Sequence, residues 1–228
     1  MAWIRSNKKG SGGGGGGSNE SYINTVGQAA INTGYVHTAD TKIKFKAIFD
    51  TASFSSWGEF FGARRGDYGS NAFCFFSRFN EGDRYGFART GQEISGDTIS
   101  ANVSSTSRPL IFVPCIFEAY GNKIEWYAIE NPSEVKSIVC PNATVNGGVA
   151  PLALFTFNNA TTSNGWSPDG HSPRVLLYWL EIYESDVLVH RYVPAYNNSQ
   201  WCLYDEVSET YLYDIAHNGA YLRGYLAN

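Results

Sequence analysis

Alternation of apolar and polar residues is clearest in residues 41–50, which read TKIKFKAIFD. The apolar residues run from Ile43 to Phe49 at every second position, and lysines stand between most of them. Side chains of a strand point alternately to its two faces, so this pattern places one face on a core and the other in water. The segment therefore predicts a half-buried strand.

Seven further segments predict short strands, each apolar or alternating and separated from the next by turn-forming Gly, Asn, Asp, Ser or Pro. They are residues 72–79, 84–90, 110–119, 123–129, 151–157, 174–184 and 188–193. Gly121-Asn122 and residues 80–83 predict tight hairpin turns. No segment longer than about ten residues shows the 3.6-residue periodicity of a helix.

Strands at this spacing, without an internal repeat, are typical of an antiparallel sandwich. We expect residues 21–228 to form one all-β domain, a two-sheet antiparallel jelly-roll sandwich. The side chains predicted to face its interior are Ile43, Phe45, Phe49, Trp126, Leu152, Leu154 and Val193.

Composition supports a folded domain and argues against nucleic-acid and membrane partners. Of 228 residues, 43% are hydrophobic and 17% charged, which is enough apolar surface for a core and excludes a disordered chain. A net charge of −4 offers no basic patch, so no nucleic-acid partner is expected. No apolar run reaches the roughly 20 residues that cross a bilayer, and no signal segment follows the N-terminus. We therefore expect neither membrane insertion nor export by a signal peptide.

The first 18 residues differ from the rest. Residues 1–9 are a short basic peptide, and residues 10–18 contain only Gly and Ser. Such a flexible linker has a mean reach of about 17 Å. One interpretation is a linker introduced for expression. The other is an anchor that docks the chain to a partner particle through Trp3, Ile4, Arg5, Lys8 and Lys9.

Both ends of the predicted domain carry family-like motifs. The motifs resemble the concanavalin A-like (laminin-G-like) jelly-roll domains of bacteriophage and prophage structural proteins. At the start they are residues 21–35 followed by Thr41-Lys-Ile, and at the end residues 180–195 and Leu203-Tyr-Asp-Glu-Val207. Phe61-Gly-Ala-Arg64 is similar to another segment of that family. The resemblance covers nearly all of residues 21–215. It implies an accessory virion protein of a tail, baseplate or head fibre, in a fold that often binds carbohydrate.

The chain departs from the family pattern at two places. Trp201-Cys202 stand where the family has Gly, and His190 is inserted before Arg191, so we expect a different local turn. The motif residues expected to tie the last strands together by hydrogen bonds are Arg191, Pro194, Tyr204 and Asp205.

Catalytic patterns are missing. A glycan hydrolase needs two carboxylates on one strand face, separated by about 5 to 9.5 Å. In residues 181–186, alternation puts Glu181 on one face and Glu184 and Asp186 on the other. Nucleophile elbows, phosphate loops and H-E-x-x-H are absent as well, so we predict that the protein is not an enzyme.

Cysteines and histidines are scattered singly along the chain. Without a C-x-x-C pair, Cys74, Cys115, Cys140 and Cys202 predict neither a zinc site nor a redox centre. We expect buried free thiols, with three pairings into two disulfides formally open. The four histidines are expected to be surface or hydrogen-bonded residues.

The longest polar loop, residues 158–173, predicts a carbohydrate site. It sets one large aromatic ring among short polar side chains, the composition of a sugar site. Alternatively, its tryptophan covers the sandwich edge. The Asn and Asp side chains also leave open that the loop binds Ca²⁺, but they do not follow a fixed ligand spacing. No other cofactor is expected. The predicted carbohydrate-binding residues are Trp166, Asn164, Asp169 and His171, with Trp57 and Tyr68 in a second candidate loop.

Together these observations predict a non-enzymatic accessory virion protein, made in the host cytoplasm, attached by its N-terminus to other virion proteins. Its lectin-like domain is expected to bind bacterial surface glycans, weakly per copy and more tightly through avidity. The alternative is a purely structural capsid or tail decoration protein, and a glycan hydrolase is less favoured. A homo-oligomer stays open.

Overall fold

The structure, a computed structural model, describes residues 20–50, 58–64, 71–78, 84–89, 112–162, 165–215 and 221–227. The predicted anchor peptide 1–9, the linker 10–18 and the predicted turn 80–83 lie outside these residues.

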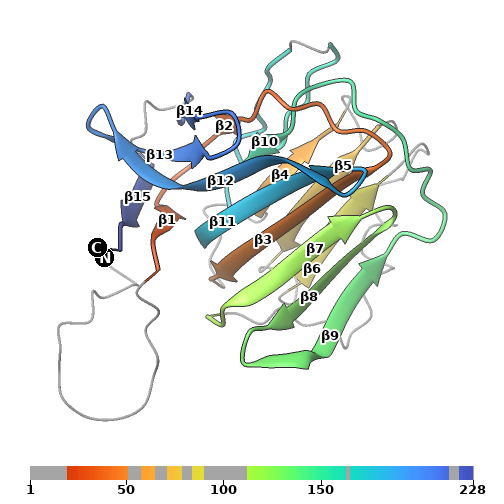
Figure 1. Cartoon of the computed structure of the whole chain (residues 1–228). Helices are drawn as coiled ribbons and strands as arrows, with labels where there is room; N and C mark the ends of the chain where they lie inside the picture. Colours follow the sequence, from red (N-terminus) through yellow and green to blue (C-terminus); the bar gives the residue numbers. More distant parts are fainter. Residues whose placement is uncertain are drawn as a thin grey trace.

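Two antiparallel sheets make up the described part of the chain (Figure 1). The larger follows the order β14-β13-β12-β11-β3-β7-β8-β9, and β1 pairs with both β11 and β15. Its strands are β1 (Tyr22–Thr25), β3 (Thr41–Phe49), β7 (Cys115–Tyr120), β8 (Lys123–Ala128), β9 (Asn131–Val139), β11 (Val175–Glu184), β12 (Val187–Asn197), β13 (Gln200–Asp205), β14 (Thr210–Leu212) and β15 (Leu222–Tyr225).

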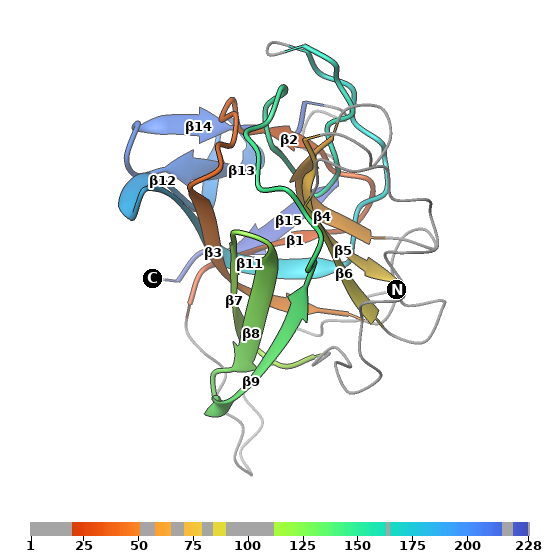
Figure 2. The same cartoon turned by 90° about the vertical axis from the view of Figure 1, so that its right-hand side faces the viewer.

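The smaller sheet follows the order β2-β10-β4-β5-β6. Its strands are β2 (Ile31–Asn32), β4 (Gly58–Ala63), β5 (Phe73–Arg78), β6 (Arg84–Arg89) and β10 (Ala153–Leu154). Figure 2 shows the two layers, with β7, β8 and β9 in one and β4, β5 and β6 in the other. No described residue is helical, so the predicted all-β, two-sheet antiparallel sandwich is confirmed.

The core lies between the sheets and is built largely of aromatic rings. Phe45 on β3 stacks on Phe117 at 4.7 Å and meets Phe60 of the opposite sheet at 4.6 Å between ring centroids. All three side chains are fully buried, as the alternation in 41–50 predicts for β3. Burying a phenylalanine stabilises a fold by about 1.5–3 kcal/mol, so these rings hold the layers together.

One predicted core residue is wrong. Val193 is only half-buried, while its neighbour Tyr192 is fully buried. The register explains this, because Tyr192 pairs with Leu180 of β11, which faces the core. Period two then turns Val193 to the outer face.

Strand ends also differ from the prediction at several places. In the described part of the segment 110–119, which begins at residue 112, the strand starts at Cys115, and 151–157 is a strand only over Ala153–Leu154. Strand β9 carried no alternation signal because most of its side chains are exposed at the sheet edge. An edge strand needs no apolar face of its own when the strand beside it supplies the core contacts.

The predicted Gly121-Asn122 hairpin is confirmed. It joins β7 to β8, with Tyr120 paired to Lys123, and Gly121 has a φ of 52°, in the region that glycine adopts freely. The prediction of buried free thiols is confirmed too. The four cysteines concerned are Cys74, Cys115, Cys140 and Cys202.

Strand β12 carries a bulge where it pairs with β11. Ile182 pairs with His190 and Tyr183 with Leu188, so Val189 is the extra residue on β12. Asp205 contacts His190, the residue that follows Val189.

Asp205 connects the last strands as expected. Its carboxylate accepts hydrogen bonds from the backbone N–H of Arg191 at 3.0 Å and of Val207 at 3.1 Å. The Ser208 hydroxyl donates to it at 2.6 Å, and His190 Nδ1 lies 2.7 Å away. Four contacts to one buried carboxylate hold β12, β13 and the following turn in register.

Candidate functional site

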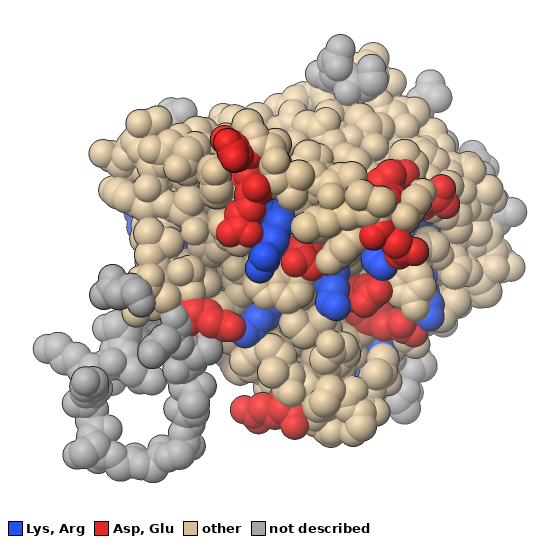
Figure 3. Space-filling view, in the orientation of Figure 1, with Lys and Arg blue, Asp and Glu red and all other residues tan. Residues whose placement is uncertain are grey.

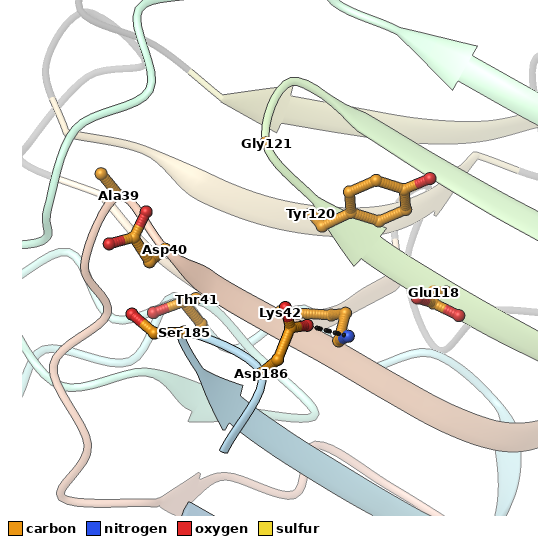
Figure 4. Close-up of a pocket in the computed structure, with 9 residues that line it drawn as sticks. All are labelled: Ala39, Asp40, Thr41, Lys42, Glu118, Tyr120, Gly121, Ser185 and Asp186. Atoms are coloured by element: carbon orange, nitrogen blue, oxygen red, sulfur yellow. Dashed lines mark hydrogen bonds and ion pairs between the residues drawn. The ribbon is translucent and has the colours of Figure 1, made fainter. Parts of the chain in front are cut away.

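A pocket of about 680 Å³ lies at one end of the larger sheet. Its volume falls within the roughly 300–1,000 Å³ of small-molecule sites. We call it the hairpin pocket, because the β7–β8 and β11–β12 hairpins and the start of β3 surround it (Figure 4). Its lining residues are Ala39, Asp40, Thr41, Lys42, Glu118, Tyr120, Gly121, Ser185 and Asp186.

Sheet register brings these segments together. Lys42 on β3 pairs with Tyr120 on β7 and with Tyr183 on β11. Paired residues on neighbouring strands face the same way, about 5 Å apart. The pocket therefore lies on the outer face of β3, the face that the lysines of 41–50 predicted to be in water. Figure 3 shows this face, where charged side chains of both signs gather over β11, β3 and β7.

The β11–β12 turn is unusual for a two-residue hairpin. Ser185 and Asp186 have φ angles of 48° and 65°, in the left-handed region where such turns normally carry Asn-Gly. Asp186 contacts Lys42 Nζ at 2.7 Å (Figure 4). This hydrogen bond raises the pKa of Lys42, so the ammonium stays charged at neutral pH.

Behind the pocket, the carboxylate of Glu184 fixes the chain that enters β3. It accepts hydrogen bonds from the hydroxyls of Tyr35, Thr38 and Thr41. Burial alone would raise its pKa, but the hydroxyl groups outweigh burial and lower it, so Glu184 is anionic. Thr41 is thereby held in place as part of the pocket lining.

Arg89 on β6 holds the same segment from the other side. Its guanidinium is buried, packs 4.2 Å from the Phe73 ring and donates to the carbonyls of Thr38 at 2.9 Å and Ala39 at 3.3 Å. Burial lowers the pKa of Arg89 to about 10, which leaves it charged. Among the described residues no carboxylate pairs with it, so its role is to position Ala39 and Asp40 at the pocket.

The predicted loop 158–173 has a firm internal framework over its described residues. Asn158 is fully buried and donates to the carbonyls of Pro151 and Gly165, each at 3.0 Å. Its side-chain oxygen accepts the N–H of Ala160 and of Ser167. Over its described residues the loop forms no regular strand or helix, and one buried asparagine supplies the hydrogen bonds that a sheet ladder would provide.

Two carboxyl groups, those of Glu59 and of the loop residue Asp169, lie beside Arg64. Asp169 accepts a hydrogen bond from Arg64 Nη2, and the fully buried Glu59 accepts the N–H of Phe157 at 3.0 Å. Burial, the charge of Asp169 and a hydrogen bond with Asp169 raise the pKa of Glu59 to about 9. Glu59 is therefore neutral at pH 7, and Arg64 forms its close contact with Asp169, while Glu59 Oε1 lies 4.0 Å from Arg64 Nη2.

The structure brings together only some of the predicted carbohydrate-binding residues. Trp166, half-buried, shares one loop with Asp169 and His171, and the His171 carbonyl accepts the N–H of Glu59 at 2.6 Å. Asn164, Trp57 and Tyr68 lie outside the described residues, as do the anchor residues Trp3, Ile4, Arg5, Lys8 and Lys9.

Of the predicted binding residues, the three that the structure describes, Trp166, Asp169 and His171, do not line the hairpin pocket. Its residues come from three distant segments, and only the register of β11, β3 and β7 joins them. Two signals were available in the sequence, the polar face of residues 41–50 and the turn at Gly121.

Within the described ranges, no three His, Cys, Asp or Glu residues are grouped so as to hold a metal ion. In the predicted loop, the side-chain oxygens of Asn159 and Asp169 accept hydrogen bonds from Arg64. The described part of the chain also has no helix of the length and apolar character that crosses a membrane. No protein-family model matches this chain, and no curated protein matches it.

Proposed function

We propose that this chain is a non-enzymatic glycan-binding protein and that the hairpin pocket holds one sugar residue. The observation that carries the proposal is the pocket itself, which sets the Tyr120 ring beside carboxylate, hydroxyl and ammonium groups on a rigid sheet. A sugar offers an apolar C–H face to an aromatic ring and hydroxyls to polar groups, so it matches this combination.

The pocket is held in its shape before any ligand arrives. Glu184 and Arg89 fix the segment from Thr38 to Thr41, and the two hairpins are anchored in the sheet. Little ordering cost is then left for binding. A shallow polar site still yields only a few kcal/mol, so we expect a dissociation constant near 1 mM, about −4 kcal/mol. Useful adhesion then needs many copies on one particle.

The setting that we propose is a bacteriophage particle, with the domain displayed on a tail, baseplate or head fibre. This rests on the resemblance of residues 180–195 and 203–207 to phage jelly-roll domains. In this arrangement residues 1–9 dock to the particle and residues 10–18 act as a spacer. Deleting residues 1–9 is expected to leave the domain folded and to abolish its incorporation into particles, as measured by blotting purified virions.

A glycan array with multivalent protein tests the binding function. We expect Tyr120→Ala, which removes the aromatic ring of the pocket, to weaken the signal at least tenfold, while Trp166→Ala, in the loop predicted from the sequence, leaves it unchanged. Loss of binding with Trp166→Ala alone would move the site to that loop. A parent protein that binds no glycan would leave the structural decoration role, and release of reducing ends from a bound glycan would contradict the non-enzymatic role.

A further inference from the structure

We propose that the hairpin pocket prefers a sugar with a free amino group, which is positively charged, over neutral and anionic sugars. The inference rests on the proposed glycan-binding function and specifies its ligand. The pocket lining contains three carboxylates, Asp40, Glu118 and Asp186, and one ammonium, Lys42. The lining therefore has an excess of negative charge.

Most of this negative charge is not neutralised by the pocket's own cation. Lys42 pairs with Asp186 at 2.7 Å. In the described part of the chain, neither Asp40 nor Glu118 has an ion pair within 4.0 Å. Neither carboxylate is therefore closed to a ligand by a direct ion pair, and the lysines near Glu118 are Lys42 and Lys44.

The charged groups around the pocket do not reverse this balance. Glu184 lies directly behind and is contacted only by hydroxyls, so it adds negative charge. Lys44 lies in register between Glu118 and Glu181, and Glu181 also has Arg191 Nε at 3.5 Å. Lys123 pairs with Glu125 at 2.9 Å, and its ammonium lies 4.6 Å from the centroid of the Tyr120 ring.

An ammonium group on a sugar ring fits this environment. Hydrogen bonds between an ammonium and a carboxylate are about twice as strong as those between neutral groups. A carboxylate, sulfate or phosphate on the sugar would instead meet Asp40 and Glu118, while the one ammonium of the lining is already paired. We therefore expect about a tenfold preference for the amino sugar over its N-acetylated form, and a weaker interaction still for an anionic sugar.

The experiment measures binding of the multivalent full-length chain to three immobilised probes at pH 6 by surface plasmon resonance. The probes are glucosamine oligomers, N-acetylglucosamine oligomers and galacturonate oligomers of equal length. The test variant is the double substitution Asp40→Asn with Glu118→Gln, which keeps the shape of both side chains. The matched control is Glu130→Gln with Glu209→Gln, which removes the same charge from exposed positions outside the pocket.

We expect the parent and the control to bind the glucosamine oligomer about tenfold more tightly than the N-acetylglucosamine oligomer. We expect the test variant to bind these two probes equally. If the parent binds all three probes alike, the charge preference is wrong while the proposed function stands. If no probe and no array glycan is bound, the proposed function itself fails. An equal loss of preference in the control and the test variant would overturn the assignment to the pocket, since net charge alone would explain it.

Discussion

Substituting Glu59 by glutamine tests whether a buried carboxyl group is neutral in the folded protein. Glu59 lies under the predicted loop, where burial and the neighbouring Asp169 raise its pKa from 4.5 to about 9. In the unfolded chain it is ionised above pH 4.5. Between these values the folded state therefore holds a proton that the unfolded state has released.

The sign of the pH dependence follows from this difference. The folded pKa is the higher one, so the contribution of Glu59 is fully present below pH 4.5 and declines as the pH rises toward 9. One proton corresponds to at most about 1.4 kcal/mol per pH unit. Between pH 7 and 8.5 the parent should lose roughly 2 kcal/mol of unfolding free energy through this group.

Glu59→Gln keeps the geometry and removes the titration. The amide oxygen can still accept the N–H of Phe157, and the amide N–H can donate to Asp169, as the neutral acid does. We expect the variant to lack the decline of about 2 kcal/mol between pH 7 and 8.5. Urea unfolding followed by tryptophan fluorescence measures this free energy at each pH.

The pH range and the control separate Glu59 from other groups. The pKa of His37 is lowered to about 3, so its effect lies mainly below pH 6.5. Burial raises the pKa of the Cys74 thiol to about 12, so this thiol acts mainly above pH 8.5, outside the range that is compared. Glu209→Gln is the exposed control and should follow the parent. Equal slopes for the parent and Glu59→Gln would show that Glu59 is already ionised in the folded state, which would refute the reasoning.

Three further substitutions test other parts of the fold. His37→Leu should raise the unfolding free energy at pH 7 by about 1–3 kcal/mol, because both buried ring nitrogens have no hydrogen-bond partner among the described residues. It should also remove the loss of stability that His37 causes as the pH falls from 6.5 toward 3; a less stable variant in thermal melts would contradict this. Asp205→Ala should cost about 3 kcal/mol or more in urea titrations, since it removes the acceptor shared by the turn after β13, and a cost below 1 kcal/mol would argue against that role. Gly62→Ala should cost about 1–3 kcal/mol, because the added Cβ would lie 2.7 Å from Cys74 Sγ and 2.8 Å from the Phe157 ring; a neutral effect would show that this layer can shift.

Alternation along the chain was enough to predict the fold class. Ile43, Phe45 and Phe49 are buried as expected, because a strand between two layers must place apolar side chains at every second position. The turn at Gly121 was predictable for a local reason too, since its backbone conformation suits glycine. Such features depend only on neighbours in the sequence.

Tertiary structure alone decided the features that depend on distant partners. The bulge at Val189 and the pairing of Tyr192 with Leu180 set which side of β12 faces the core, and Val193 was misplaced for that reason. Glu59 became neutral through burial beside Asp169, which no local pattern marks. The hairpin pocket exists because antiparallel register sets Lys42 beside Tyr120 and Asp186. Pairing between strands is a long-range choice made by the packed core, whereas the alternation within each strand is written in the sequence itself.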